Sequence, residues 1–455
     1  MMKLIYNRMF CVLISLLLLI IISASCRKSN YEIKEGIVTI NDQGEGTGTV
    51  TWTSDRSYLL EGFVFVNDAQ VLTIEAGTVI RAKTGQGSAA SALIVARGGK
   101  IIARGNSDEP IIFTVEDDDL QGSVPVDAQG LWGGLIILGA APLNLSLGES
   151  HIEGIPFTEP RGEYGGQNPQ DDSGVLQYVS IRHAGTNIGE GNEINGLTLG
   201  AVGSSTIIDH VEVISCADDA FEFFGGEVNC KYLVAAFCGD DAFDFDLGYR
   251  GKGQYYLAIQ DAGEGDKIIE CTGGVDPVTG QPYTMPLIYN ATFIGRGTGP
   301  GKKIMEFSLN GAGTVANSVM VLQDRGCLVE YVEGSLDSYW QFGNENLQIA
   351  NNVFYNIGNQ SVDDIFGVYA AGGVDVGQQN DVFRAYFAAA ENMIADPGVT
   401  RINDKYKLIP DANVFDELAA YPDPWFENVN YKGAFYTYQW MAGWTDLYET
   451  GLILD

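Results

Sequence analysis

The chain has 455 residues, of which 45% are hydrophobic and 57 are glycine, so it can bury a large core in one elongated domain or in two or three compact ones. Its 59 acidic and 26 basic residues give a formal net charge of −33. A surface of this charge repels phosphate backbones, which excludes nucleic acid as an expected partner.

Residues 1–25 have the pattern of an export signal. Lys3 and Arg8 precede the apolar run VLISLLLLII, and the small residues SAS stand directly before Cys26. This arrangement resembles a bacterial lipoprotein signal, in which the cysteine becomes the lipidated first residue; an ordinary cleaved export signal is the alternative. Because no later stretch is long and apolar enough to span a membrane, we expect a body that is attached only through lipid on Cys26.

Short phrases repeat along the rest of the chain. LTIEAGTVIRA at 72–82 recurs as LIVARGGKIIA at 93–103, an offset of 21 residues. A second phrase, with an asparagine two positions after an apolar residue, recurs at 288–294, 315–321 and 349–355. Runs of β-branched and aromatic residues bounded by glycine, asparagine or aspartate are typical of strands and turns.

A unit of about 21–22 residues with several short strands cannot bury its apolar face alone, so successive units are expected to stack into a solenoid. We predict an all-β fold, a parallel β-helix over residues 60–360, preceded by an N-terminal strand and cap over 26–59. In this register Leu72 and Leu93 would occupy equivalent places in neighbouring coils.

The phrase CADDAFEFF at 216–224 recurs as CGDDAFDFD at 238–246, an offset of 22 residues. Equivalent positions of neighbouring coils lie about 4.8 Å apart, so Cys216 should lie over Cys238, either in a disulfide or as two small buried side chains. The alternation sends four phenylalanines to the core and the acidic residues to the opposite face; the four are Phe221, Phe223, Phe243 and Phe245. The stacked aspartates are Asp218, Asp219, Asp240 and Asp241, and the rest of the acidic ladder is Glu222, Asp244 and Asp246.

These stacked carboxylates allow three interpretations. Two like charges about 5 Å apart repel by roughly 1 kcal/mol in water and by more at a protein surface. Calcium would relieve this repulsion, since it takes six to eight oxygen ligands, and the four stacked aspartates are the candidate ligands. Paired carboxylates about 5–5.5 Å apart also suit a retaining glycosidase. The third interpretation is a set of acidic turns relieved by water and salt. No organic cofactor is expected.

Four basic residues near the acidic phrases are candidates for binding an anionic group such as a uronate or a sulfate. Arg250 and Lys252 in GYRGKGQ follow the second phrase, and Arg182 and His183 in SIRHAG precede the first. Neutralisation of the acidic ladder is the alternative role for Arg250 and Lys252. For His183 the alternatives are a structural hydrogen bond and acid–base catalysis.

Residues 361–455 change character. NDVFRAYFAAAENMI at 380–394 has helical spacing, with Asn380 or Asp381 as the N-cap. We expect this C-terminal part to cap the last coil, and an aromatic platform for sugars is the alternative role of its tryptophans. Those tryptophans are Trp425, Trp440 and Trp444.

Two resemblances extend this reading of the residues. The stacked phrases resemble the pectin-lyase-like right-handed β-helix superfamily, and GDD at 239–241 is similar to the paired-aspartate motif of polygalacturonases. Longer phrases, among them LTIEAGTVI, ALIVARGGKI, YVSIRHAGT and GNEINGLTLGAVG, resemble a family of largely uncharacterised Bacteroidota envelope lipoproteins. That resemblance implies a right-handed β-helix and an outer-membrane setting, and it brings no established reaction.

We therefore expect a lipid-anchored protein of the cell envelope that binds a polysaccharide or glycoconjugate with the help of calcium, or that assists an outer-membrane uptake system. Its partner would be a glycan or an outer-membrane transport protein. The alternative is a glycan-cleaving enzyme, a glycoside hydrolase or polysaccharide lyase, that uses the stacked carboxylates. Either face of the outer membrane is compatible with the sequence.

Overall fold

The structure is a computed structural model, and it describes residues 36–189, 192–261, 263–297, 299, 301–411 and 418–454. These residues all fall within one compact unit, Lys34–Asp455. The predicted export signal at 1–25 and the predicted lipidation site Cys26 lie outside the described residues. Across the described part of the chain, no helix has the length and apolar character needed to cross a membrane.

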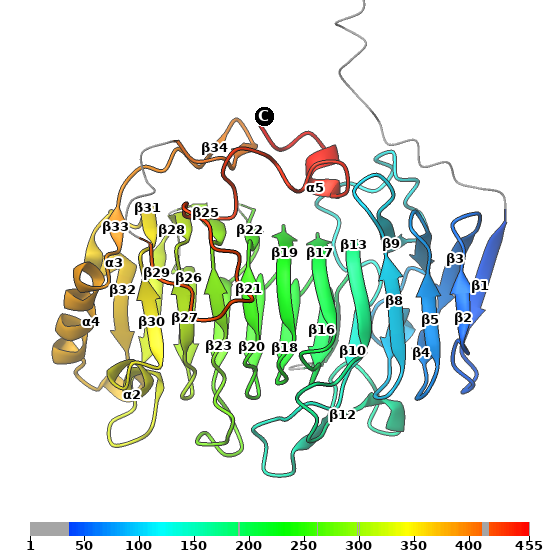
Figure 1. Ribbon diagram of the computed structural model, residues 1–455, viewed down its shortest axis with the longest axis horizontal. Coiled ribbons are helices and arrows are strands. Elements are labelled where there is room, and N and C mark those ends of the chain that lie inside the picture. The colour runs from blue at the N-terminus through cyan, green and yellow to red at the C-terminus, as the bar shows by residue number, and fades with distance from the viewer. Residues whose placement is uncertain are drawn as a thin grey trace, which may run out of the picture. The chain divides into compact units, whose positions relative to one another are not determined.

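Parallel strands stack coil upon coil in this unit, as predicted, and form a right-handed parallel β-helix (Figure 1). One face is a ten-stranded sheet, and a 19-stranded sheet supplies two further rows of strands. The ten-stranded sheet consists of β4 (Phe63–Val66), β7 (Ala92–Val95), β10 (Leu135–Leu138), β16 (Leu197–Gly200), β18 (Phe221–Phe224), β20 (Phe243–Asp246), β23 (Lys267–Thr272), β26 (Lys303–Ser308), β29 (Arg325–Glu330) and β32 (Phe366–Tyr369).

Three long strands pass through both rows of the 19-stranded sheet: β13 (Gly174–Arg182), β17 (Ile207–Ile214) and β19 (Asn229–Ala236). The first row also contains β1 (Ile37–Asn41), β3 (Ser57–Glu61), β6 (Val79–Ala82), β9 (Ile111–Val115), β22 (Leu257–Ile259), β25 (Thr292–Gly297), β28 (Val319–Gln323), β31 (Val353–Ile357) and β33 (Met393–Ile394). The second row also contains β2 (Val50–Trp52), β5 (Val71–Ile74), β8 (Lys100–Arg104), β21 (Lys252–Gln254), β24 (Leu287–Tyr289), β27 (Gly313–Ala316) and β30 (Leu347–Ala350). The parallel rows therefore extend on both sides of the predicted range 60–360.

Small antiparallel pairs and short helices decorate the coils. The pairs are β11 (Glu149–His151) with β12 (Glu163–Gly165), β14 (Thr186–Gly189) with β15 (Asn192–Ile194), and β34 (Thr400–Ile402) with β35 (Lys405–Lys407). The helices are η1 (Gly87–Ala89), η2 (Pro160–Gly162), α2 (Ser338–Gly343), α3 (Val362–Ile365), η3 (Ala371–Gly373), α4 (Gly377–Ala389) and α5 (Asp446–Glu449).

The predicted equivalence of Leu72 and Leu93 is wrong. Leu72 pairs with Ile101 in the 19-stranded sheet, whereas Leu93 pairs with Leu135 in the ten-stranded sheet. The two similar phrases begin at different corners of a coil, because any apolar strand followed by a glycine turn gives the same pattern whichever sheet it enters.

The 22-residue offset holds in the middle coils. Phe221 pairs with Phe243 in register, and their rings stack in the core with centroids 5.4 Å apart. Cys216 and Cys238 therefore occupy equivalent places, and both are free, buried thiols. Of the two alternatives for this pair, the structure has two small buried side chains.

The repeated asparagines lie where one row of the 19-stranded sheet turns into the other. Asn290, Asn317 and Asn351 have φ angles of 55°, 54° and 56°. Asparagine tolerates this left-handed backbone better than most residues. Since β24 pairs with β27 and β27 with β30, the three asparagine phrases are equivalent in neighbouring coils, as their repetition indicates.

Helix α4 covers the last coil, where the ring of Phe383 stacks on that of Phe366 with centroids 4.6 Å apart. The predicted N-cap at Asn380 or Asp381 is wrong, because the helix begins earlier, with Val376 as its N-cap. The Asn380 side chain instead exchanges hydrogen bonds with the backbone of β32. The Asn380 side chain, which the sequence pattern assigned to the cap of its own helix, therefore binds a neighbouring strand instead.

The aromatic C-terminal segment does not cap the last coil, contrary to our expectation. Residues 418–454, which we call the C-terminal strap, run back along the coils until α5 lies beside β17 (Figure 1). There Trp440 and Trp444 make edge contacts with the ring of His210, at 6.1 and 5.7 Å between centroids. The buried carboxylate of Glu212 accepts hydrogen bonds from the first two backbone N–H groups of α5. Aromatic composition showed that this segment packs on the solenoid, but it carries no information about which coil.

Candidate functional site

The two acidic phrases lie side by side on the outer surface of the ten-stranded sheet. Each phrase is a turn followed by a strand, β18 or β20, and these strands are neighbours in the sheet (Figure 1). Glu222 pairs in register with Asp244 on the face opposite the core phenylalanines Phe221 and Phe243. In the turns, the backbone N–H of Asp241 donates to the carboxylate of Asp219 at 2.8 Å. The structure therefore brings the predicted acidic residues together from neighbouring coils.

These residues line a recess of about 570 Å³, which we call the acidic recess. Its walls come from other parts of the chain: Glu153 lies in the connection between β11 and β12, Glu193 belongs to β15, and Glu270 belongs to β23. The carboxylates that line the recess are those of Glu153, Glu193, Asp218, Asp219, Glu222, Asp240, Asp241, Asp244 and Glu270.

The acidic recess has a buried floor and an open mouth. Asp219 and Glu222 are each 7% exposed, and Asp241 is 1% exposed. Asp218 is partly buried, and Asp240 is exposed. A bound ion or ligand could therefore contact buried carboxylates on one side and solvent on the other.

Two buried polar groups of the ten-stranded sheet have no hydrogen-bond partner in the described structure. One is Oδ1 of Asp244, and the other is the hydroxyl of Thr198, which is 1% exposed and pairs in register with Glu222. Glu222 itself accepts a hydrogen bond from the Asn195 amide. A buried polar group without a partner costs about 1–3 kcal/mol, and of these two groups Asp244 lines the recess, where a ligand atom would give its oxygen a partner.

Lysines neutralise the acidic residues in the coils that follow the recess. Nζ of Lys267 lies 3.1 Å from Glu270 in β23, and Lys303 forms the same pair with Glu306 in β26. Lys267 pairs with Lys303 and Glu270 with Glu306 in register, so these ion pairs form two parallel rows along the sheet. In each of these two coils a lysine stands three positions before the glutamate that it neutralises, whereas the next coil has Arg325 and Leu328 at these positions.

This arrangement changes in the two coils of the acidic recess. The positions that correspond to the lysine and glutamate of β23 hold Asp241 and Asp244 in one coil and Asp219 and Glu222 in the other. Each pair of opposite charges is therefore replaced by a pair of like charges. Two such pairs stack in neighbouring coils, so their repulsion adds along the sheet.

Burial and neighbouring carboxylates raise pKa values throughout the acidic recess. Burial, followed by the charges of Glu193 and Asp240, raises the pKa of Asp218 to about 7. Burial is also the largest cause of the raised pKa values of Asp219, Glu222, Asp241 and Asp244. Asp266 beside the recess behaves oppositely: burial acts against it, but its hydrogen bonds with two lysines lower its pKa to about 2. The recess therefore favours uptake of protons or of a cation.

Asp246, the last residue of the predicted ladder, does not line the recess. It ends β20, is partly buried and accepts a hydrogen bond from the backbone N–H of Leu247 at 2.5 Å. Burial raises its pKa to about 7. Asp246 thus provides a comparison residue with the same charge on the same strand.

Arg182 and His183, two of the four predicted anion-binding residues, lie outside the recess and make structural contacts. Arg182 pairs with Asp446 of α5 at 2.7 Å and donates to the Ser180 hydroxyl. His183 is buried, with Nδ1 2.6 Å from the carbonyl oxygen of Ala128. Of the interpretations considered for His183, this contact matches the structural one.

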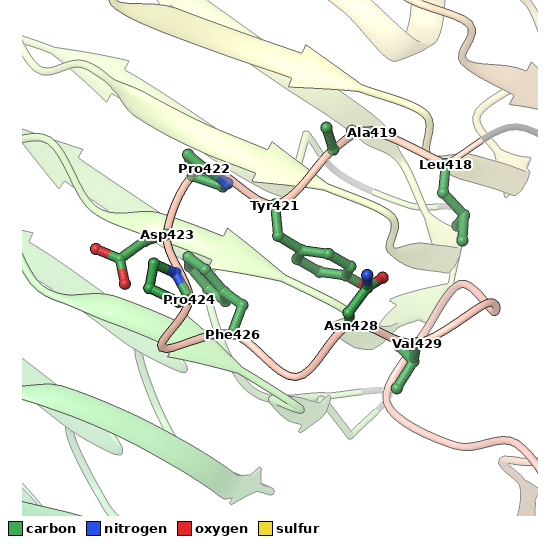
Figure 2. A pocket seen from close by; sticks show the side chains of 10 residues that line it. Leu418, Ala419, Tyr421, Pro422, Asp423, Pro424, Phe426, Asn428 and Val429 are labelled. Atoms are coloured by element: carbon green, nitrogen blue, oxygen red, sulfur yellow. The ribbon is translucent and has the colours of Figure 1, made fainter.

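Arg250 and Lys252 do not line the acidic recess either. Lys252 pairs with Asp423 at 2.7 Å, beside a second pocket of about 520 Å³ inside a loop of the C-terminal strap (Figure 2). Figure 2 shows the ring of Tyr421 within this loop and the carboxylate of Asp423 pointing away from it. Arg250 is exposed. Lys267, which sequence reasoning did not single out, is the residue that meets the acidic ladder.

Sequence reasoning also missed part of the carboxylate set. KIIEC at 267–271 and KIMEF at 303–307 repeat the strand pattern of the acidic phrases, and this signal could have identified Lys267 and Glu270. Glu153 and Glu193 come from insertions between coils, where no repeat marks them.

The donor set of the recess consists of carboxylate and amide oxygens, which suits a hard divalent cation such as calcium. Carboxyl groups with raised pKa values also suit proton transfer to or from a glycosidic oxygen. The arrangement therefore supports cation binding first and acid–base chemistry second.

The model of a family described as "Pectate-lyase like beta helix domain" matches residues 44–445. No curated protein and no solved structure matches the chain.

Proposed function

Because the chain belongs to the pectate-lyase-like β-helix family, we propose that it binds a polysaccharide or glycoconjugate at the acidic recess with the assistance of calcium. The family fits a polysaccharide-related role. The observation that carries the proposal is a change between neighbouring coils of one sheet. Lysine–glutamate ion pairs in β23 and β26 give way to the like-charge pairs Asp219/Glu222 and Asp241/Asp244, in which the aspartate lies in the turn before β18 or β20.

The residues at the recess fit a calcium ion. The carboxylate of Asp241 is already neutralised by Lys267. It accepts a hydrogen bond from the backbone N–H of Lys267 at 2.6 Å and pairs with the ammonium group of the same lysine. The stacked aspartates that remain, together with two carboxylates of the ladder, would hold the ion. These residues are Asp218, Asp219, Glu222, Asp240 and Asp244.

Calcium supplies a positive charge with open coordination positions, which attracts the carboxylate or sulfate groups of an acidic glycan. The exposed carboxylate of Asp240 at the mouth holds that charge where a long chain can reach it. Without the cation, the same surface would repel an acidic glycan, because the recess is lined by nine carboxylates.

A glycan array tests this proposal. Protein freed of metal with EDTA and the same protein in calcium are applied to an array that contains neutral, sulfated and uronate glycans. We expect binding of acidic glycans in calcium, lost in EDTA and in Asp219→Asn, and retained in the matched variant Asp246→Asn. Binding that is equally strong in EDTA, or an absence of acidic glycans among the hits, would contradict the proposal.

A glycan-cleaving activity is the second candidate. It is favoured by Asp218, whose pKa of about 7 allows it to donate a proton near neutral pH, and by Asp240, whose carboxylate oxygen lies within 4.8 Å of it. Chromatography of every array hit after prolonged incubation separates the two functions. New reducing ends or unsaturated products that disappear in Asp218→Asn would establish cleavage, and unchanged glycans would leave binding alone.

We further propose that the protein is held at the outer membrane by lipid on Cys26 and assists glycan binding or uptake there. The apolar run and small residues before Cys26 support this anchor, and the long phrases that resemble Bacteroidota envelope lipoproteins support the location. Cys26→Ala should release the protein from the membrane fraction, whereas Cys11→Ala, a change inside the signal, should not. Retention of the Cys26→Ala protein in the membrane would rule out lipid as the attachment.

A further inference from the structure

The outer edges of the last strands are closed at the C-terminal end of the solenoid, where α4 lies opposite to β1 (Figure 1). In β30, the N–H of Ile349 donates to the hydroxyl of Tyr386 at 3.3 Å, and its carbonyl oxygen accepts from the Asn392 amide at 2.7 Å. In β32, the backbone of Val368 exchanges two hydrogen bonds with the Asn380 side chain. Side chains of α4 and of the residues after it therefore occupy the backbone groups to which another strand would bind.

At the N-terminal end, the chain also closes the edge of the ten-stranded sheet. The N–H of Phe65 in β4 donates to the carboxylate of Asp42 at 3.1 Å, and its carbonyl oxygen accepts from the N–H of Thr47 at 2.8 Å. Arg161 forms an ion pair with Asp42 at 2.7 Å. One of the three edges at this end is therefore capped by the chain itself.

The first row of the 19-stranded sheet ends at β1, and the outer edge of β1 is open. The N–H of Ser57 donates to the carbonyl oxygen of Gly36, so the backbone groups of Val38 and Ile40 face β3. The N–H and C=O groups of the alternate residues then point outward, and the hydrogen bonds of the described chain include none to these six groups. The alternate residues are Ile37, which is 63% exposed, and the exposed Thr39 and Asn41.

The second row ends at β2, which has an open edge at the same end of the solenoid. The N–H of Glu75 donates to the carbonyl oxygen of Trp52 at 3.0 Å, so Trp52 faces β5 and the backbone of Thr51 points outward. Thr51 is exposed, and the neighbouring Val50 is 39% exposed. Two adjacent rows of strands therefore lack a cap at this end, in the part of the chain that the structure describes.

Neither strand has the features that usually protect an open edge. Folded proteins place charged residues, proline or bulges in edge strands, because an unprotected edge pairs with other chains. The sequences of β1 and β2 are IVTIN and VTW, without charge or proline, in a chain that has 59 acidic and 26 basic residues. The lack of protection in so highly charged a chain indicates that another strand covers this edge.

The outward groups of β1 are complementary to those of a second β1 in antiparallel orientation. A two-fold axis at Thr39 places Thr39 opposite the same residue of the second copy, and Ile37 opposite Asn41 of the second copy. Each of these three pairs exchanges two hydrogen bonds, which gives six in all. Because β1 has no charged residue, the two strands approach without opposed like charges, although each chain has a net charge of −33.

We propose that the protein forms a dimer in which β1 pairs with β1 of a second copy, antiparallel around a two-fold axis at Thr39. The first row of strands then continues from one copy into the other, and the exposed side chain of Ile37 is covered at the junction. The nine residues at 27–35 connect Cys26 to Gly36, and nine extended residues span at most about 32 Å. The lipids proposed for the two copies therefore both start near the junction, where one membrane can hold them. The dimer involves no residue of the acidic recess.

Sedimentation velocity of the full-length protein in detergent tests this proposal, at concentrations between about 1 and 100 μM, where dimers of ordinary affinity dissociate. We expect a monomer–dimer equilibrium that shifts toward the dimer in high salt, because salt screens the repulsion between two acidic chains. Two variants of Thr39 should weaken the association about tenfold or more. Thr39→Pro removes an N–H that points outward, a position at which an edge strand tolerates proline, and Thr39→Lys places two like charges opposite each other. The matched control Thr437→Lys, an exposed threonine of the C-terminal strap, should leave the association unchanged.

Chemical cross-linking locates the contact independently of the variants that weaken it. The five cysteines of the described chain are buried, so Thr39→Cys adds an accessible thiol. A short bis-maleimide should join two copies of Thr39→Cys, and it should not join copies of the parent protein. Gln378→Cys, an exposed position on α4 at the other end of the solenoid, should also remain unjoined.

A parent protein that stays monomeric over the whole concentration range would overturn the dimer. Protection of the β1 amides from hydrogen exchange in that monomer would show that the chain's own residues cover the edge. A dimer that persists unchanged in Thr39→Lys, without a cross-link in Thr39→Cys, would overturn the assignment of the contact to β1. If Thr39→Pro fails to fold, Thr39→Lys and the cross-link decide the outcome.

Discussion

In the absence of calcium, the protein should lose stability as the pH rises from 5 to 7.5. Asp218 and Asp246 have pKa values of about 7 in the folded protein, against an ordinary value of 3.8. A carboxyl group with a raised folded pKa binds its proton more tightly in the folded state than in the unfolded one. Its stabilising contribution is complete below about pH 4 and is lost as the pH rises through 7.

The size of this loss follows from the two pKa values. One pKa unit corresponds to about 1.4 kcal/mol, so two such groups set an upper limit of about 2.7 kcal/mol per pH unit between pH 4 and 7. Solvent reaches Asp218 at the mouth of the recess, which screens its interactions. We therefore expect a loss of about 3 kcal/mol in the free energy of unfolding between pH 5 and 7.5. Asp266, with its pKa lowered to about 2, loses its contribution only as the pH falls below about 4, outside this window.

Urea unfolding followed by tryptophan fluorescence measures this free energy at each pH, in EDTA and in calcium. Calcium stabilises the folded state by mass action, and protons compete with it for the carboxylates, so the stabilisation by calcium should increase with pH. Asp218→Asn should flatten the pH dependence mainly in EDTA, whereas Asp246→Asn, outside the cation sites, should flatten it in both buffers. A stability in EDTA that rises across this window, or a calcium effect of the same size at pH 5 and 7.5, would refute the reasoning.

Three further predictions concern the residues around the recess and along the coils. Lys267→Met removes the ammonium group beside Asp241, so we expect the free energy of unfolding in EDTA to fall by about 3–5 kcal/mol and to be partly restored by calcium. Lys267→Arg keeps the charge and should cost much less. Equal losses in the two variants would contradict the role of the charge. Phe243→Ala removes a buried stacked ring and should cost about 3–5 kcal/mol in urea unfolding, so a loss below about 1 kcal/mol would show that the stack does not support the coils. Glu212→Gln weakens the attachment of α5, so limited proteolysis should cut residues 418–454 faster, while the circular dichroism spectrum of the coils stays unchanged. An unaltered cleavage rate would show that this carboxylate does not hold the C-terminal strap.

The repeats in the sequence predicted the fold, but they predicted the equivalent positions only where the coils carry no insertion. The 22-residue offset between Phe221 and Phe243 is also the structural offset, because the two coils have the same length. The offset between Leu72 and Leu93 misled, since strands of different sheets share the same apolar pattern. A repeat period in the sequence therefore predicts the solenoid architecture more reliably than it predicts which two residues are equivalent in neighbouring coils.

The acidic floor of the candidate site could be predicted from the sequence, and its walls could not. Asp219 and Glu222 belong to a repeated phrase whose stacking follows from strand geometry. Glu153 and Glu193 reach the recess from insertions whose path depends on packing far along the chain. Burial is the largest cause of the raised pKa of Asp219, and the charges of Asp241 and Asp244 follow it. The sequence predicted the neighbouring charges but not the burial.

The central claim is that a metal cation occupies the coils in which the chain supplies no ammonium group. Anomalous X-ray diffraction from crystals of the protein grown in calcium, and from crystals soaked in terbium as a stronger scatterer, tests it most directly. The account predicts anomalous density between Asp219 and the carboxylates of Glu222 and Asp244, and none between Lys267 and Asp266. Ordered water at the first position, with no anomalous density at saturating calcium or terbium, would contradict it.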